Sequence, residues 1–156
     1  MSSKPQARTA SNDDMLRLDN QLCFAVYSAS LAMTRLYKPL LEPLGLTYPQ
    51  YLVMLVLWEQ DGLMVSELGH RLSLDSGTLT PLLKRLEASG FVDRRRDASD
   101  ERRVHIHLSP AGRRLKSRAA RLPACLFAAT QCPVDEVVAL TRQVQQLRDR
   151  IARSAA

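Results

Sequence analysis

Residues 65–108 decide the fold, and they read VSELGHRLSLDSGTLTPLLKRLEASGFVDRRRDASDERRVHIHL. In the first half of this stretch, Val65–Leu72 and Gly77–Ser89 place apolar residues at the three- and four-residue spacing of amphipathic helices. Ser66 is the expected N-cap of the first of these segments. The polar residues 73–76 between them predict a tight turn. This half therefore predicts two short helices joined by a turn.

The second half of the stretch predicts a β-hairpin. Gly90 suits the left-handed residue that ends many helices, because glycine adopts that conformation without a side-chain clash. Phe91–Arg95 and Val104–Leu108 are extended runs, and the second alternates apolar residues with histidines. The charged loop Asp97–Arg103 lies between them. Two helices, a turn and a hairpin with an arginine-rich tip are typical of a winged helix-turn-helix.

Two more helices are expected before this unit. Leu16–Leu36 contains neither glycine nor proline and repeats apolar residues at helical spacing, and the pattern breaks from Pro39 onward. Thr47 then stands where an N-cap would, and the apolar run Tyr51–Trp58 continues the helix that Thr47 begins.

Two further helices are expected after the hairpin. Ser109 followed by Pro110 predicts a helix start, and this helix runs to Leu122, where Pro123 disturbs it. The last helix spans Val134–Ala152. Its apolar residues form a heptad-like seam, which predicts packing on another helix, either of the same chain or, as we prefer, of a second copy across a two-fold axis. The seam comprises Val137, Leu140, Val144, Leu147 and Ile151.

The expected fold is mainly α with a small β-hairpin wing. It is a winged helix-turn-helix with dimerisation helices at both ends. The expected parts are a flexible segment (1–14), an N-terminal helix for dimerisation and sensing (15–45), the DNA-binding domain (46–112) and C-terminal dimerisation helices (113–156).

Length and composition fit one globular domain. The chain has 156 residues, 46 % hydrophobic and 24 % charged, which excludes a disordered or collagen-like protein. Its longest apolar runs fall short of the roughly 20 residues of a membrane span. The polar N-terminus lacks the apolar core of a secretory signal. These observations predict a cytoplasmic protein that does not insert into membranes.

The positive charge is concentrated in one segment. The chain carries 22 Lys and Arg against 16 Asp and Glu, and residues 91–121 hold ten of the former and only four of the latter. Such a segment predicts an anionic partner, although a merely solvated charged face has the same composition. Nucleic acid is favoured over an anionic membrane surface, because the segment has no bulky apolar face.

In a winged helix-turn-helix the second helix enters the major groove of DNA, and the wing reaches a neighbouring groove or phosphates. The expected partner is double-stranded operator DNA, and the alternative is a winged helix that binds protein. Mixed base and backbone contacts are expected from the second helix and mainly phosphate contacts from the wing. The helix residues are Ser76, Thr78, Thr80, Lys84 and Arg85, and the wing residues are Arg94, Arg95, Arg96, Asp100, Arg102 and Arg103.

The order of the helices, the wing and the paired terminal helices resemble the MarR-type transcriptional regulators across most of the chain. That family commonly carries Asp-x-Arg-Asp-x-Arg at the wing, and this chain has Asp97-Ala98-Ser99-Asp100-Glu101-Arg102. Ser99 departs from the pattern, because it stands where the family commonly has an arginine. Asp100 and Arg102 are kept, and the resemblance implies that an acidic residue holds an arginine in position. Ordinary turn chemistry is the alternative for Asp97 and Asp100.

Three cysteines occur without the spacing of a metal site and without a secretory signal, so a structural disulfide framework is not expected. Cys23 precedes Tyr27 by four residues, which puts both side chains on one helix face. A tyrosine hydroxyl can donate to a thiolate, the form of cysteine that attacks peroxides. The alternative from spacing alone is that Cys23 is a small buried hydrophobe.

Residues 18–27, LDNQLCFAVY, resemble the start of the OhrR-type organic hydroperoxide sensors within the MarR family, and residues 46–51, LTYPQY, resemble part of their sensing pocket. The resemblance implies that Cys23 is oxidised to sulfenic acid and that tyrosines stabilise its thiolate, although these tyrosines could instead pack in the core. It also implies a second, resolving thiol that forms a disulfide. The tyrosines are Tyr37, Tyr48 and Tyr27, and the candidate resolving thiols are Cys132, which we prefer, and Cys125.

The sequence therefore predicts a homodimeric redox-sensing repressor that releases operator DNA when an organic hydroperoxide oxidises Cys23. No metal or other cofactor is expected. One alternative is a MarR-type repressor released by a reversibly bound phenolic ligand. A thiol peroxidase is a weaker alternative, because the chain has no Gly-rich nucleotide loop, paired carboxylates or Cys-x-x-Cys motif, so an enzyme is not expected.

Overall fold

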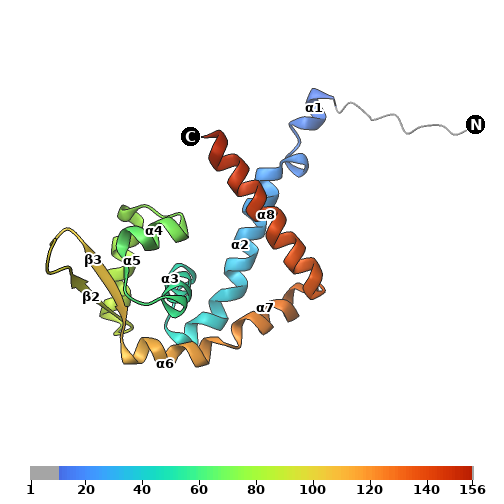
Figure 1. Ribbon diagram of the computed structural model, residues 1–156. Helices are drawn as coiled ribbons and strands as arrows, with labels where there is room; N and C mark the ends of the chain where they lie inside the picture. Colours follow the sequence, from blue (N-terminus) through green and yellow to red (C-terminus); the bar gives the residue numbers. More distant parts are fainter. Residues whose placement is uncertain (1–10, 156) are drawn as a thin grey trace, which may run out of the picture. The chain divides into compact units, whose positions relative to one another are not determined.

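A computed structural model describes residues 11–155 (Figure 1). The contacts within the chain form two compact units, one ending at Tyr37 and the other beginning at Lys38. The first unit holds the short helix α1 (Asn12–Met15) and most of helix α2 (Leu22–Leu41). Ten residues of the flexible segment expected at 1–14 lie outside the described residues, and the rest include most of α1.

The predicted start of the first long helix at Leu16 is wrong, because local side chains compete for the backbone. The Asn20 side chain donates to the Asp14 carbonyl and the Gln21 side chain to the Met15 carbonyl, each over 2.6 Å. Such bonds replace those of a regular helix. Helix α2 therefore begins only at Leu22.

The predicted break at Pro39 is also wrong. Pro39 lies in the last turn of α2, which ends at Leu41. A proline removes one backbone hydrogen bond from a helix. At Pro39 only two helical residues follow, so the helix is not interrupted before its end. Gly45 follows with a φ of 69°, and this left-handed residue turns the chain toward the next helix.

Helix α3 (Tyr48–Glu59) begins as predicted at the N-cap Thr47. The Thr47 N–H donates to Oε1 of Gln50 over 2.9 Å, and the Gln50 N–H donates to Oγ1 of Thr47 over 3.5 Å. This reciprocal pair is a capping box. The inner face of α3 places Val53, Met54 and Leu57 in the core.

Helices α4 (Val65–Leu72) and α5 (Ser76–Ala88) confirm the predicted helix-turn-helix. Ser66 is not the N-cap of α4, because Met64 takes that position and its N–H donates to Oε2 of Glu67 over 2.7 Å. The turn is tight at Gly69, where an added Cβ would lie 2.7 Å from the Leu74 carbonyl oxygen. Only glycine fits this approach of α4 to the turn.

The predicted hairpin is also confirmed, as strands β2 (Val92–Arg96) and β3 (Val104–Leu108). A third strand, β1 (Leu63–Met64), pairs with the other edge of β3, so the antiparallel sheet has the order β1-β3-β2. The sequence does not predict β1, since two residues are too few to show the period of a strand. The core lies between this sheet and the helices, and its fully buried side chains include Leu68, Leu79, Leu83, Leu86, Val92 and Ile106.

Three helices follow the sheet: α6 (Pro110–Ala119), α7 (Leu122–Thr130) and α8 (Val134–Ser154). The sequence prediction has one helix to Leu122 and no α7, and it is wrong on this point. Pro123 does not disturb a helix but lies in the first turn of α7, where a missing N–H leaves no intrahelical bond unmade.

Within residues 11–155, no single helix has the length and apolar composition needed to cross a bilayer. Two pairs of helices, each bent at the break between its members, have the required length and composition only when the two members are taken together. The same part of the chain contains no group of three His, Cys, Asp or Glu side chains that could hold a metal ion.

Candidate functional site

Helix α5 presents a polar face. Its buried face is made by Leu79, Leu83 and Leu86, which fixes the opposite side toward solvent. The predicted contact residues Ser76, Thr78, Lys84 and Arg85 are exposed, and Thr80 is half-buried. The helix residues predicted to bind DNA are therefore at least partly accessible to a partner.

Asp75 is a site residue that the sequence reading missed. It is the N-cap of α5, and its carboxylate accepts from the Thr78 N–H over 2.7 Å. This bond, together with one from the Thr78 side chain, lowers the pKa of Asp75 below its usual range. An aspartate just before the first apolar residues of a helix is the signal that could have found it.

The loop at the tip of the wing is closed by its own acidic residues. The Asp97 carboxylate accepts from the N–H and the hydroxyl of Ser99, over 2.9 and 2.7 Å. Asp100 accepts from the Arg102 N–H over 3.0 Å and forms an ion pair with Arg103 at 3.7 Å. Asp97 and Asp100 thus perform turn chemistry, and Asp100 also holds an arginine. Ser99, which departs from the family pattern, is part of this network.

His105 ties the wing to the base of the sheet. Its Nε2 lies 3.3 Å from the Asp97 carboxylate and its Nδ1 lies 3.2 Å from the Gly62 carbonyl oxygen. The hydrogen bonds from Ser99, and then the one from His105, lower the pKa of Asp97 to about 2. The sequence reading did not single out this histidine, because its partners lie far away along the chain.

The wing arginines fall into two groups. Arg95, Arg96, Arg102 and Arg103 are exposed. Of these, only Arg103 forms an ion pair among the described residues. Arg94 is half-buried and lies 3.3 Å from the Glu87 carboxylate on α5. The wing therefore offers an open cationic surface from which Arg94 is turned away.

Basic residues of α6 are partly used inside the molecule. Arg113 pairs with Asp61 at 3.0 Å, and Arg118 donates to the Pro43 carbonyl over 2.8 Å. Burial alone would raise the pKa of Asp61, but hydrogen bonds from the Leu108 N–H and from Arg113 lower it. The positive charge of residues 91–121 is thus not all available to an external partner.

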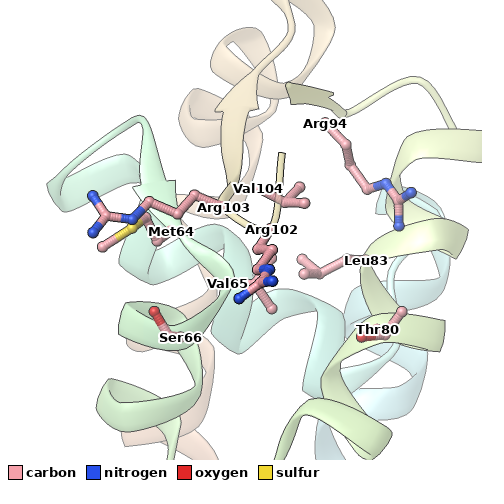
Figure 2. Close-up of a pocket in the computed structure, with 9 residues that line it drawn as sticks. All are labelled: Met64, Val65, Ser66, Thr80, Leu83, Arg94, Arg102, Arg103 and Val104. Atoms are coloured by element: carbon pink, nitrogen blue, oxygen red, sulfur yellow. The ribbon is translucent and has the colours of Figure 1, made fainter. Parts of the chain in front are cut away.

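A crevice of about 300 Å³ lies between α4, α5 and the wing. Arg94, Arg102 and Arg103 line it together with the hydroxyl-bearing Ser66 and Thr80 (Figure 2). The helix face and the wing therefore meet along a surface with hydrogen-bond donors and positive charge. The hydroxyls and the guanidinium groups of Arg102 and Arg103 are of the kind that contact a sugar–phosphate backbone, whereas the guanidinium of Arg94 is paired with Glu87.

Cys23 is exposed and is the second residue of α2. Tyr27 lies one turn further along the same helix and is 61 % exposed. The thiol is thus not a buried hydrophobe of the described chain. Tyr37 lies 14 residues beyond Cys23 on the same continuous helix, about 21 Å away at 1.5 Å per residue. A hydrogen bond between these two side chains within one chain is excluded by this length.

Tyr48 is the first residue of α3 and is half-buried. Burial raises the pKa of the Tyr48 hydroxyl above its usual value. Its ring lies 6.4 Å from that of Tyr51, centroid to centroid. The α3 capping box fixes the backbone at this position.

The two remaining cysteines differ in environment. Cys125 lies inside α7 and is exposed. Cys132 lies between α7 and α8, just before Pro133. Cys132 is half-buried, and its thiol donates to the Thr130 carbonyl over 3.3 Å.

Helix α8 leaves three of the five residues of its apolar seam exposed and the other two half-buried. None of its residues is buried in the described chain, and Leu140, Val144 and Ile151 are 47, 50 and 56 % exposed. A seam of this kind is stable in water only when another surface covers it.

Comparison with known proteins gives the same picture. Residues 35–119 match the family model described as transcriptional regulator SarA/Rot. The HTH-type transcriptional regulator TtmR of Methylorubrum extorquens (strain PA1) is 55 % identical over 139 residues, 89 % of this chain and 71 % of that protein. The organic hydroperoxide resistance transcriptional regulator of Bacillus subtilis (strain 168) is 50 % identical over 114 residues, 73 % of this chain and 78 % of that protein.

Solved structures are similar as well. Reduced AbfR bound to DNA is 37 % identical, with a TM-score of 0.71, and the match covers 91 % of this chain and 99 % of that one. Disulfide-formed AbfR is 38 % identical, with a TM-score of 0.58, covering 86 % of this chain and 95 % of that one. The fold is therefore similar to one that has been observed on DNA and in a disulfide-formed state.

Proposed function

Because this chain belongs to the MarR/OhrR-type winged-helix transcriptional regulators, we propose that it acts as a dimer and leaves its operator when an organic hydroperoxide oxidises Cys23. The chain is a redox-sensing transcriptional repressor. The observation that carries the proposed mechanism is the exposed Cys23 thiol in the first turn of α2, one turn from Tyr27.

Operator DNA is bound by α5 and the wing. Ser76 and Thr78 lie at the start of α5, where a helix in the major groove meets base edges. Arg95, Arg96 and Arg102 carry no ion pair with a carboxylate among residues 11–155, so their charge is available to phosphates.

The dimer is formed by the terminal helices. The exposed seam of α8 supplies an apolar surface with a heptad-like repeat, which suits packing against a second helix. A two-fold dimer presents two copies of α5 to successive major-groove half-sites, about 34 Å apart. Any movement of the subunits then changes the spacing of the two helices.

The sensing tyrosine Tyr37 is contributed by the partner subunit. Tyr37 and Cys23 lie about 21 Å apart on one straight helix, so the phenol of one protomer can reach only the thiol of the other. The hydroxyl of Tyr48, at the start of α3, is a second donor in this proposal.

The chemistry needs no cofactor. The Cys23 thiolate attacks the outer oxygen of the hydroperoxide, the O–O bond breaks, and after proton transfer the products are an alcohol and a cysteine sulfenic acid. A second thiol then attacks the sulfenic sulfur, forming a disulfide and releasing water. Cys132 is the preferred partner because it lies between helices, and Cys125 is the alternative because it is exposed.

The test is operator binding before and after one equivalent of cumene hydroperoxide. We expect the wild-type protein to stop binding the DNA upstream of its own gene after oxidation and to bind it again after thiol treatment. Cys23→Ser should bind this DNA under all three conditions. Cys125→Ser and Cys132→Ser are matched controls that identify the resolving thiol by non-reducing mass analysis. Loss of operator binding by Cys23→Ser after the same oxidant would overturn the mechanism. A repressor that is released by a phenolic ligand would keep its operator binding in the presence of the oxidant.

The tyrosines are tested by the rate of Cys23 oxidation. We expect Tyr37→Phe and Tyr48→Phe each to slow it about tenfold, because a hydrogen bond to a charged group contributes about 1.5 kcal/mol or more. Operator binding by the reduced proteins should remain. Oxidation at the wild-type rate in both variants would remove the tyrosines from the mechanism.

A further inference from the structure

Arg94 differs from the other wing arginines in the direction of its side chain. Alternate residues of a strand point to opposite faces of the sheet, so Arg94 shares its face with the buried Val92 while Arg95 takes the opposite face. The cross-strand partner of Arg94 is the fully buried Ile106. The Arg94 stem therefore lies along the core and not along the outer surface of the wing.

Glu87, in the last turn of α5, meets this side chain. The Arg94 Nε lies 3.3 Å from the Glu87 Oε2, and the side chains are 29 and 43 % exposed. The Nε atom is buried and its N–H is not aligned for a hydrogen bond, so the contact is an ion pair. A partly dehydrated guanidinium depends on such a carboxylate, because its lost hydration is otherwise uncompensated. Figure 2 shows Arg94 running from its strand toward α5.

The pair connects the two parts of the molecule that meet DNA. Helix α5 ends at Ala88 and β2 begins at Val92, so three residues join the helix to the hairpin. The ion pair from Glu87 to Arg94 adds a side-chain link beyond this short connection. It holds the middle of β2 against the helix and so sets the direction in which the wing leaves α5.

We propose that Arg94 is a positioning residue for DNA binding, which holds the wing at the angle from α5 that lets both reach the duplex. Its guanidinium is engaged by Glu87 and neutralises no phosphate, in contrast to Arg95. Glu87, an acidic residue close to the DNA-binding surface, thereby strengthens operator binding. This inference rests on the proposed function, since it requires that α5 and the wing contact DNA together.

Glu87→Gln is the most informative variant, because a purely electrostatic effect of Glu87 and a positioning role predict opposite changes in operator affinity. Removing an acidic residue near DNA strengthens binding when charge alone matters. If Glu87 positions Arg94, its loss weakens operator binding about three- to fivefold, the scale of an exposed to half-buried ion pair. Glu101→Gln is the matched control, since Glu101 is exposed on the same wing and its removal should leave binding unchanged or tighter. Thermal melting by circular dichroism confirms that both variants fold.

The salt dependence of binding provides a second, independent readout. Arg95→Met removes a phosphate contact and should lower the slope of log Kd against log salt by about 0.9. Arg94→Met should weaken binding about as much as Glu87→Gln while keeping the wild-type slope, and the double variant should be no weaker than either single one.

Two results would overturn the positioning role: Glu87→Gln binding as tightly as wild type or more tightly, or Arg94→Met lowering the salt slope as Arg95→Met does. Failure of the wild-type protein to bind operator at any salt concentration would instead overturn the proposed function. The two failures are therefore distinguishable.

Discussion

Gly112 is a residue at which the fold admits no side chain. It lies buried in the first turn of α6, and a methyl group on its Cα would overlap the Phe91 carbonyl oxygen. The same carbonyl accepts from the Ser109 N–H over 3.0 Å, and the Gly112 carbonyl accepts from the Trp58 indole over 3.0 Å. This close approach fixes the start of α6 against the hairpin.

Gly112→Ala should therefore lower the free energy of unfolding by about 2 kcal/mol, the usual effect of forcing a group into a packed site. Urea denaturation measures the change. Ser117→Ala, on the exposed side of the same helix, is the control and should stay within about 0.5 kcal/mol of wild type. Equal stability of Gly112→Ala and wild type would show that α6 can move away from Phe91.

Asp97 is the residue whose ionisation the wing most strongly favours. Its pKa is lowered from 3.8 to about 2, mainly by the hydrogen bonds from Ser99. Since the folded-state pKa is below the unfolded one, the ionised carboxylate stabilises the fold above about pH 4, and this contribution disappears as the pH falls from 4 toward 2.

Asp97→Asn should accordingly make the protein less stable than wild type at pH 5 to 7, with the difference shrinking as the pH falls to 2. Chemical denaturation across this range measures it. Asp93→Asn removes a carboxylate from the same hairpin without disturbing the Ser99 bonds. This control variant should still lose stability between pH 4 and pH 2, as the wild-type protein does. A constant offset between Asp97→Asn and wild type at all pH values would contradict the assignment.

Among the elements, α3 depends on its capping box. The bond from the Thr47 N–H to Gln50 is 2.9 Å, whereas the bond from the Gln50 N–H to Thr47 is 3.5 Å, and Gln50 is buried. We therefore expect Gln50→Ala to lower the stability by at least the roughly 1 kcal/mol typical of a cap, and Thr47→Ala by less. Thermal or urea unfolding tests this order, with Thr47→Ser as the control that keeps the hydroxyl. A larger loss of stability in Thr47→Ala than in Gln50→Ala would show that the hydrogen bond accepted by the Thr47 hydroxyl contributes more.

At the scale of the whole molecule, the partly exposed seam of α8 is an apolar surface that a single chain leaves uncovered. Val144→Glu places a charge in the centre of the seam. If the proposed dimer forms through this seam, we expect the variant to be monomeric and to bind operator much more weakly, since burying an unpaired charge is costly. Gln145→Glu makes the same charge change beside the seam and should remain dimeric. Sedimentation velocity measures both, and a dimeric Val144→Glu would move the interface elsewhere.

The sequence by itself determined the elements that depend on local periodicity and local caps. The helix-turn-helix at 65–88, the hairpin and the start of α3 at Thr47 are set by apolar spacing, tight turns and hydrogen bonds between residues three apart. These signals lie within a few residues of one another, so they can be read without knowing the fold. The proposed oxidation of Cys23 rests instead on similarity to known sensors.

Only the tertiary structure decided the features that join distant residues. Strand β1 forms because Leu63 pairs with Ile106. Arg113 of α6 pairs with Asp61, 52 residues earlier in the chain, so its charge is neutralised within the molecule. Arg94 and Arg95 are identical in sequence terms, yet the pleat of β2 turns one toward Glu87 and the other outward. Burial and ion pairing depend on which surfaces meet in three dimensions, and no local pattern in the chain encodes that.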